Sequence, residues 1–228
     1  MNKNPANFVP LTPISFLHRT ADIYGQHKAV IYENREYSWS ESRERCVRIA
    51  SSLANLGIKQ GDTVSVLAFN TPEMFESHFS IPMAGAVLNT INIRLDAVTI
   101  AHILDDSNAK ILLVDRELFE VASESLSACS ASPKVVVIED EFADSRPEVS
   151  ENIIKYESLV SDGDPLFEWH RPYDEWQPLS LNYTSGTTGR PKGVVYHHRG
   201  SYLMSMGTVI GWELPNHPVY LYSVPMFH

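Results

Sequence analysis

The first 138 residues alternate between segments with helix signals and short apolar runs. The helix signals are apolar residues three and four positions apart, capping residues, or both. They predict helices at residues 14–24, 40–56, 72–85, 97–105 and 117–126. The short apolar runs between them, rich in β-branched residues, are residues 63–68, 87–91, 110–114 and 134–138. Helices that alternate with short strands of this kind predict an α/β fold with mainly parallel sheets flanked by helices.

Local signals predict where several elements begin and end. Pro13 favours a helix start at its own position, and Ser40 is the expected N-cap of the next helix. Gly57 follows the last apolar position of that second helix and is expected to end it. Residues 29–32 and 36–39 flank a three-residue turn, so they predict a β-hairpin.

The charge of the chain is concentrated in one stretch. The whole chain has a formal net charge of −10, and residues 139–175 alone contain 12 acidic and 3 basic side chains. The stretch has little periodicity apart from a short helix expected near 156–160. This acidity disfavours a nucleic-acid binder, which needs a basic surface.

The acidic stretch divides the chain into three expected parts. Residues 1–138 form a first α/β subdomain, 139–176 a connecting segment, and 177–228 the start of a second α/β subdomain. In the last part we expect strands at 179–183, 194–196 and 219–224, and a helix over 198–210.

Cysteine usage and hydropathy exclude several classes. Neither Cys46 nor Cys129 lies in a C-x-x-C pair, so a zinc site is unsupported; Cys46 is expected in the core, and a disulfide between the two is left open. We find no signal-peptide pattern, and the longest apolar run, 81–88, is too short to span a bilayer. A cytoplasmic protein without a transmembrane segment is expected.

Residues 182–193, Asn-Tyr-Thr-Ser-Gly-Thr-Thr-Gly-Arg-Pro-Lys-Gly, carry the strongest chemical signal. Glycines let backbone N–H groups approach an anion, hydroxyls donate hydrogen bonds or bind Mg²⁺, and a lysine adds positive charge. The candidate phosphate-binding residues are Thr184, Ser185, Gly186, Thr187, Thr188, Gly189 and Lys192. An ordinary flexible loop is the alternative, and Lys192 favours the phosphate site.

The spacing of this loop excludes three common motifs. Gly193 stands where a Walker A motif needs a serine or threonine after its lysine, and no G-x-G-x-x-G sequence is present. Ser185 has no G-x-S-x-G environment, which disfavours a hydrolase. The adjacent His197 and His198 have no carboxylate or cysteine partner in the sequence nearby, which disfavours a metal site.

Residues 183–193 resemble the signature of the AMP-forming acyl-CoA synthetases, in the adenylate-forming superfamily that includes luciferases. Pro225-Met226-Phe227-His228 resembles the start of the family's acid-pocket segment. Tyr37-Ser38-Trp39-Ser40 and Asn89-Thr90-Ile91-Asn92 are also similar to the family. Residues 194–200 and 217–220 look most like the short- and medium-chain fatty acyl branch, which includes 3-methylmercaptopropionyl-CoA ligases.

The resemblance implies a two-step reaction. A carboxylate would attack ATP to give acyl-AMP and diphosphate, and CoA would then displace AMP. Residues 184–189 and Lys192 would hold the phosphates, Thr184 would bind Mg²⁺, and Lys192 and His228 would be catalytic, with His228 orienting the acid. ATP, CoA and a carboxylic acid are the implied partners, and a homo-oligomer of the full-length enzyme is left open.

The resemblance also implies that these 228 residues are an N-terminal portion, because family members are about twice as long. The Glu-containing magnesium motif, the ribose-binding Asp and the C-terminal lysine are not in the sequence. We expect the portion alone to be inactive and to expose apolar surface. Two alternatives stay open: an adenylate-forming enzyme with another acyl acceptor, and a non-catalytic nucleotide-binding fragment.

Overall fold

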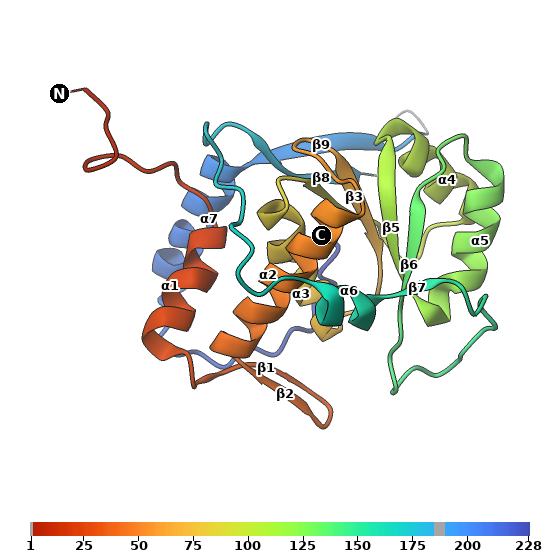
Figure 1. The fold of residues 1–228 in the computed structure, drawn as a ribbon, viewed down its shortest axis with the longest axis horizontal. Helices are drawn as coiled ribbons and strands as arrows, with labels where there is room; N and C mark the ends of the chain where they lie inside the picture. The colour runs from red at the N-terminus through yellow and green to blue at the C-terminus, as the bar shows by residue number, and fades with distance from the viewer. Residues whose placement is uncertain (1, 185–189) are drawn as a thin grey trace.

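The computed structural model describes residues 2–184 and 190–228, and their strands form one main sheet and one hairpin. The main sheet has the order β7-β6-β5-β3-β4-β8-β9 within the described residues (Figure 1). Its pairs are parallel except for β8 and β9, which are antiparallel. Its strands are β3 (Thr63–Leu67), β4 (Val87–Thr90), β5 (Ala109–Asp115), β6 (Lys134–Ile138), β7 (Ile154–Lys155), β8 (Pro178–Thr184) and β9 (Lys192–His197).

Helices cover both faces of the parallel part of this sheet. Helices α1, α2, α3 and α6 lie over one face, and α4 and α5 lie over the other (Figure 1). The helices are α1 (Ile14–Tyr24), α2 (Trp39–Asn55), α3 (Pro72–Met83), α4 (Ala97–Asp106), α5 (Phe119–Ala128), α6 (Tyr156–Asp162) and α7 (His198–Gly211), with a 3₁₀ turn η1 (Arg116–Leu118) before α5. The predicted α/β class, with a mainly parallel sheet flanked by helices, is confirmed.

Alternation along each strand explains why two cores form. Ile111 and Leu113 of β5 enter the core under α2 and α3, whereas Leu112 and Val114 enter the core under α4 and α5. Successive side chains of a strand point to opposite faces, so a strand covered on both sides must be apolar at every position. The continuous apolar runs in the sequence therefore reflect burial on both faces.

Several predicted elements match closely, and two details are wrong. The helix predicted at 14–24 and the strand at 134–138 have the observed bounds of α1 and β6, and the hairpin forms as β1 (Lys28–Tyr32) and β2 (Arg35–Ser38). The N-cap of α2 is Ser38, not Ser40, because Ser38 and Glu41 exchange hydrogen bonds in a capping box. Residues 219–224 are not a strand.

The acidic segment packs against α2 through its short helix α6. Arg45 of α2 pairs with Glu157 of α6, and the Ser52 hydroxyl donates to the Leu159 carbonyl at 2.7 Å. The predicted short helix is confirmed as α6. Strands from before and after this segment share one sheet, since β8 pairs with β4. The division at 138 and 176 stays a prediction.

The remaining expectations concern cysteines and membranes. Cys46 is fully buried in the core, as predicted, and both cysteines are free thiols. Among the residues that the structure describes, no helix is long and apolar enough to cross a membrane.

Candidate functional site

The antiparallel hairpin of β8 and β9 brings two predicted site residues together. Thr184, the last residue of β8, lies opposite Lys192, the first residue of β9, and both side chains are exposed. The predicted phosphate-binding residues Ser185, Gly186, Thr187, Thr188 and Gly189 lie outside the described residues. The described geometry therefore fixes the two ends of the candidate phosphate loop, at the carboxyl end of β8.

A half-buried tyrosine anchors the end of β8. The Tyr183 hydroxyl donates to Asp106 Oδ2 at 2.6 Å, at the C-terminal end of α4. Burial, together with this hydrogen bond, raises the pKa of Tyr183 above its usual value, so the phenol stays protonated. Because neighbours on a strand face opposite ways, Asn182 and Thr184 lie on the other face from Tyr183.

The segment with His228 is held mainly through its backbone. Asn70, three residues after β3, donates its amide N–H groups to the carbonyls of Tyr222 and Val224 at 3.1 and 2.9 Å. Its side-chain oxygen accepts from the Met226 N–H at 2.8 Å. The carbonyls of Tyr222 and Val224, which a strand would pair with a neighbouring strand, bind this one side chain instead.

Two further side chains hold Phe227, which is buried in the core. The Thr90 hydroxyl, at the end of β4, donates to the Phe227 carbonyl at 3.0 Å. Asn182 of β8 donates its side-chain amide to Thr90 Oγ1 at 2.9 Å and contacts the same carbonyl at 3.3 Å. His228 follows with an exposed side chain, its ring 4.7 Å from the ring of Phe227.

Of the predicted site residues, the structure describes Thr184, Lys192 and His228, and it places them near the ends of β4 and β8. Thr184 ends β8, and His228 follows Phe227, whose carbonyl is bound by Thr90 of β4 and Asn182 of β8. Asn182 therefore connects the two, because it lies on the same strand as Thr184. Asn70, Thr90 and Asn182 were not predicted as site residues. Asn182 opens the loop sequence and Thr90 lies in a family-like stretch, but a single sequence does not show that they touch the backbone of Phe227.

His197 and His198 each have a local role. His197 Nδ1 accepts from the Gly200 N–H at 2.9 Å and so caps α7. His198 is buried, with Nδ1 2.9 Å from the Thr12 hydroxyl, and burial lowers its pKa to about 4. Among the described residues, no group of three histidine, cysteine or carboxylate side chains could hold a metal ion.

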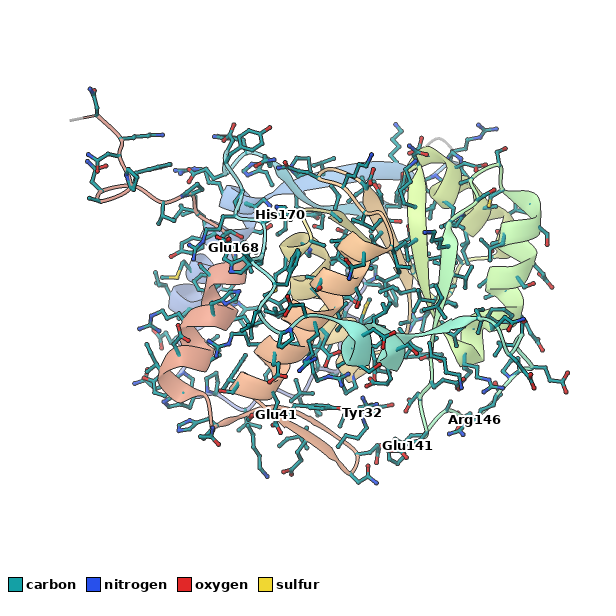
Figure 2. The ribbon with its side chains drawn as sticks, in the orientation of Figure 1. Tyr32, Glu41, Glu141, Arg146, Glu168 and His170 are labelled. Carbon is teal, nitrogen blue, oxygen red and sulfur yellow. The ribbon has the colours of Figure 1, made fainter. Side chains whose placement is uncertain are left out.

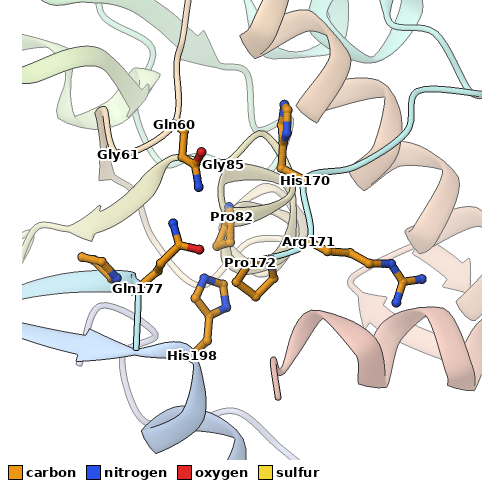
Figure 3. Close-up of a pocket in the computed structure, with 10 residues that line it drawn as sticks. Gln60, Gly61, Pro82, Gly85, His170, Arg171, Pro172, Gln177 and His198 are labelled. Carbon is orange, nitrogen blue, oxygen red and sulfur yellow. The ribbon is translucent and has the colours of Figure 1, made fainter. Parts of the chain in front are cut away.

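A small cleft lies at the opposite edge of the sheet. Gln60, Gly85, His170, Gln177 and His198 are among its lining residues, before the starts of β3, β4 and β8 (Figure 3). It encloses about 30 Å³, room for roughly two water molecules rather than for a nucleotide or an acid. The cleft is therefore separate from the candidate site.

Buried ionisable groups lie beneath the β1–β2 hairpin. Arg35 pairs with Glu73, and the Tyr32 hydroxyl donates to Asp140 Oδ2 at 2.5 Å. Tyr32 lies at the same edge of the molecule as the acidic segment that carries Glu141 and Arg146 (Figure 2). Asp115 is also buried here, and burial raises its pKa to about 6. These contacts attach the hairpin to the sheet, away from the phosphate loop.

The comparison with family models decides the family. A model described as "AMP-binding enzyme" matches residues 17–228, nearly the whole chain. The chain belongs to the AMP-binding enzyme family. The matched residues include the candidate phosphate loop, both of its described ends, and the segment of His228.

Curated relatives agree with this assignment. A 2-methylpropanoate–CoA ligase of Humulus lupulus is 45% identical over 100% of this chain and 42% of its own length. A peroxisomal trans-cinnamate:CoA ligase of Petunia hybrida is 46% identical over 98% of this chain and 41% of its own length. The chain thus spans about two-fifths of the relatives it matches.

Solved structures show the same fold. A long-chain-fatty-acid–CoA ligase from Archaeoglobus fulgidus superposes with a TM-score of 0.83 at 22% identity, over 97% of this chain and 44% of the other. At this identity the likeness extends to the fold alone.

Proposed function

We propose that this protein is an ATP-dependent acyl-CoA synthetase, which converts a carboxylic acid, ATP and CoA into acyl-CoA, AMP and diphosphate through an acyl-adenylate. Membership of the AMP-binding family over residues 17–228 is the observation that carries the proposal. Two curated relatives with CoA-ligase names, 45% and 46% identical, support it. Since the chain spans about two-fifths of their length, the proposal concerns the protein at its full length.

The described residues would act mainly through position and charge. Lys192 would offer an ammonium group to phosphate oxygens, and Thr184, opposite it, would add a hydroxyl at the other end of the loop. Ser185, Gly186, Thr187, Thr188 and Gly189 would donate to the same phosphates. His228 would orient the carboxylate of the acid. Phosphoryl chemistry needs such positioning more than covalent help from the protein.

Magnesium would be held only in part by this portion of the chain. Thr184 offers one exposed hydroxyl, and Mg²⁺ usually takes few protein ligands beside water and phosphate oxygens. One hydroxyl fits that pattern. When bound, the ion would neutralise phosphate charge.

The test is ATP–diphosphate exchange by the protein at its full length, over a panel of carboxylic acids. Wild-type exchange that depends on one class of acid supports the proposal. Thr184→Ala and Lys192→Ala should each lower the exchange rate by roughly 10²-fold or more, as losses of transition-state contacts do. Arg19→Ala, which removes a cationic side chain far in sequence from the loop, is the matched control. Unchanged exchange in both loop variants would remove them from the site.

Two further measurements separate the alternatives. Release of acyl-CoA after addition of CoA distinguishes a CoA ligase from an enzyme that adenylates the acid for another acceptor. Nucleotide binding without exchange would indicate the non-catalytic alternative. The acid itself stays open, because the two relatives are named for a branched aliphatic acid and an aromatic acid. The cytoplasmic location also stays a prediction, since one of these relatives is named peroxisomal.

A further inference from the structure

Three polar side chains from three parallel strands converge on one short stretch of backbone. Asn70 follows β3, Thr90 ends β4, and Asn182 lies in β8. Together they make six hydrogen bonds: five to the backbone of residues 222–227, and one that joins Asn182 to Thr90. We call Asn70, Thr90 and Asn182 the backbone clamp.

Each hydrogen bond of the clamp needs a particular donor, so the loss of one hydroxyl or amide group should weaken it. The Thr90 hydroxyl has one proton, and it is directed to the Phe227 carbonyl because Asn182 donates to its oxygen. This chain of two hydrogen bonds runs from β8 through β4 to the residue before His228. A change at either side chain would leave a buried acceptor poorly paired.

The clamp also connects the two halves of the candidate site. Asn182 and Thr184 share one face of β8, two residues or about 7 Å apart along the strand. The side chain that holds the Phe227 carbonyl is therefore rigidly joined to the start of the phosphate loop. Phe227 is buried, so His228 is placed by its neighbour's backbone and not by its own side chain.

We propose that Asn70, Thr90 and Asn182 are positioning residues, which set His228, and with it the carboxylic acid, at a fixed distance from Thr184 at the end of β8. The inference rests on the proposed function for its reaction, and on the described contacts for the clamp. In the described hydrogen bonds, Asn70 binds the backbone of residues 222–226, and Thr90 donates to the Phe227 carbonyl while it accepts from Asn182. Asn182 contacts the same carbonyl and belongs to the strand that leads into the loop.

The kinetic test uses the full-length protein with the acid that gives the fastest exchange. Thr90→Val, which keeps the shape but removes the proton donor, should raise KM for the acid about tenfold and leave KM for ATP within about twofold. Thr90→Ser should restore the wild-type value. Asn70→Asp, which cannot donate to the carbonyls of Tyr222 and Val224, should act like Thr90→Val. Asn182→Ala should raise both KM values.

Ser65→Ala is the matched control. The Ser65 hydroxyl donates to Asn89 at 2.8 Å, and Asn89 in turn donates to the Leu181 carbonyl, so this pair joins the same three strands. Neither residue touches residues 222–227 in the described hydrogen bonds. The control should lose thermal stability and keep both KM values. Equal shifts of both KM values in Thr90→Val, or a shift of neither, would overturn the proposal.

Hydrogen exchange tests the clamp without any activity. The peptide that covers residues 222–228 should exchange about tenfold faster in Thr90→Val and at the wild-type rate in Thr90→Ser and Ser65→Ala. Unchanged exchange in Thr90→Val would show that the clamp does not hold this segment. Absence of ATP–diphosphate exchange in the wild type, with the expected hydrogen exchange, would instead contradict the proposed function and leave the clamp in place.

Discussion

Apolar side chains are buried at one end of the main sheet and exposed at the other. At β3, β5 and β6 the apolar side chains lie under helices on both faces, and Leu113 is 0% exposed. At β9, α7 and residues 213–224, which we call the uncovered end, Ile210 is 72% and Leu221 is 87% exposed. The expectation of exposed apolar surface is confirmed here.

The difference shows that apolar composition alone does not determine burial. Val194 and Val195 of β9 are β-branched, as are most residues of β6. Both valines are nevertheless exposed, because the described helices do not bury them as they bury β6. The hydrophobic effect stabilises only the area that is removed from water. Substitutions at the two ends should therefore have very different effects on stability.

The largest expected effect comes from a buried charge in the covered part. Arg45 pairs with Glu76, whose side chain is 2% exposed, and Arg45→Met would leave that carboxylate buried without a charged partner, with the Tyr156 hydroxyl still donating to it. We expect a loss of about 3–5 kcal/mol in the free energy of unfolding, measured with urea. Lys28→Met, at an exposed pair with Glu36, should cost less than about 1 kcal/mol. Similar losses in both variants would contradict the comparison.

A cavity in the same part should cost somewhat less. Leu113→Ala removes a fully buried side chain from the core under α2 and α3, and we expect about 2–5 kcal/mol of destabilisation. Urea unfolding gives the value directly. A cost below 1 kcal/mol would mean that this end of the sheet is not closely packed.

The buried carboxyl at the end of β5 predicts a pH dependence. Burial raises the pKa of Asp115 to about 6 from an ordinary value of 3.8, so the folded state binds this proton more tightly than the unfolded chain. The contribution of Asp115 should therefore lower stability as pH rises from about 4 to 6. Asp115→Asn should be more stable than the wild type at pH 7.5, by about 1–3 kcal/mol, and nearly equal to it at pH 4. Urea midpoints at both pH values test this, and an equal difference at both would contradict it.

The smallest effect is expected at the uncovered end. Ile210→Ser should change the free energy of unfolding of the 228-residue chain by less than about 0.5 kcal/mol, because the side chain already meets water. Ile103→Ser, a buried residue of α4, is the matched comparison and should be strongly destabilising. A large effect of Ile210→Ser would show that α7 is covered in solution.

Most of the fold could be predicted because strand and helix signals are local. α1 and β6 have their predicted bounds, and Gly57, with φ of +98°, ends α2 as expected. The N-cap was misassigned although the sequence contained its signal, since Ser38 is followed three positions later by Glu41. A serine is a stronger N-cap signal when a glutamate follows three positions later, and Ser40 has no such partner.

The candidate site could be predicted only in part. Thr184 and Lys192 are close in sequence, so the loop motif named them and the hairpin brings them together. Asn70 and Thr90 are more than 130 residues from the backbone that they hold. Strand order determines such contacts, and the periodicity of one strand carries no information about its neighbours. The same holds for residues 219–224, where the carbonyls of Tyr222 and Val224 bind Asn70 and not a neighbouring strand.

The order of strands in the sheet also has a consequence for synthesis on the ribosome. β3, β4, β5 and β6 can pair as soon as residue 138 has emerged, but the edge of β4 that faces away from β3 must wait for β8, about 90 residues further along the chain. Until then β4 has an open edge whose backbone groups are unpaired. The next part to emerge is the acidic segment, and its net negative charge should repel the same segment of a neighbouring chain on the polysome.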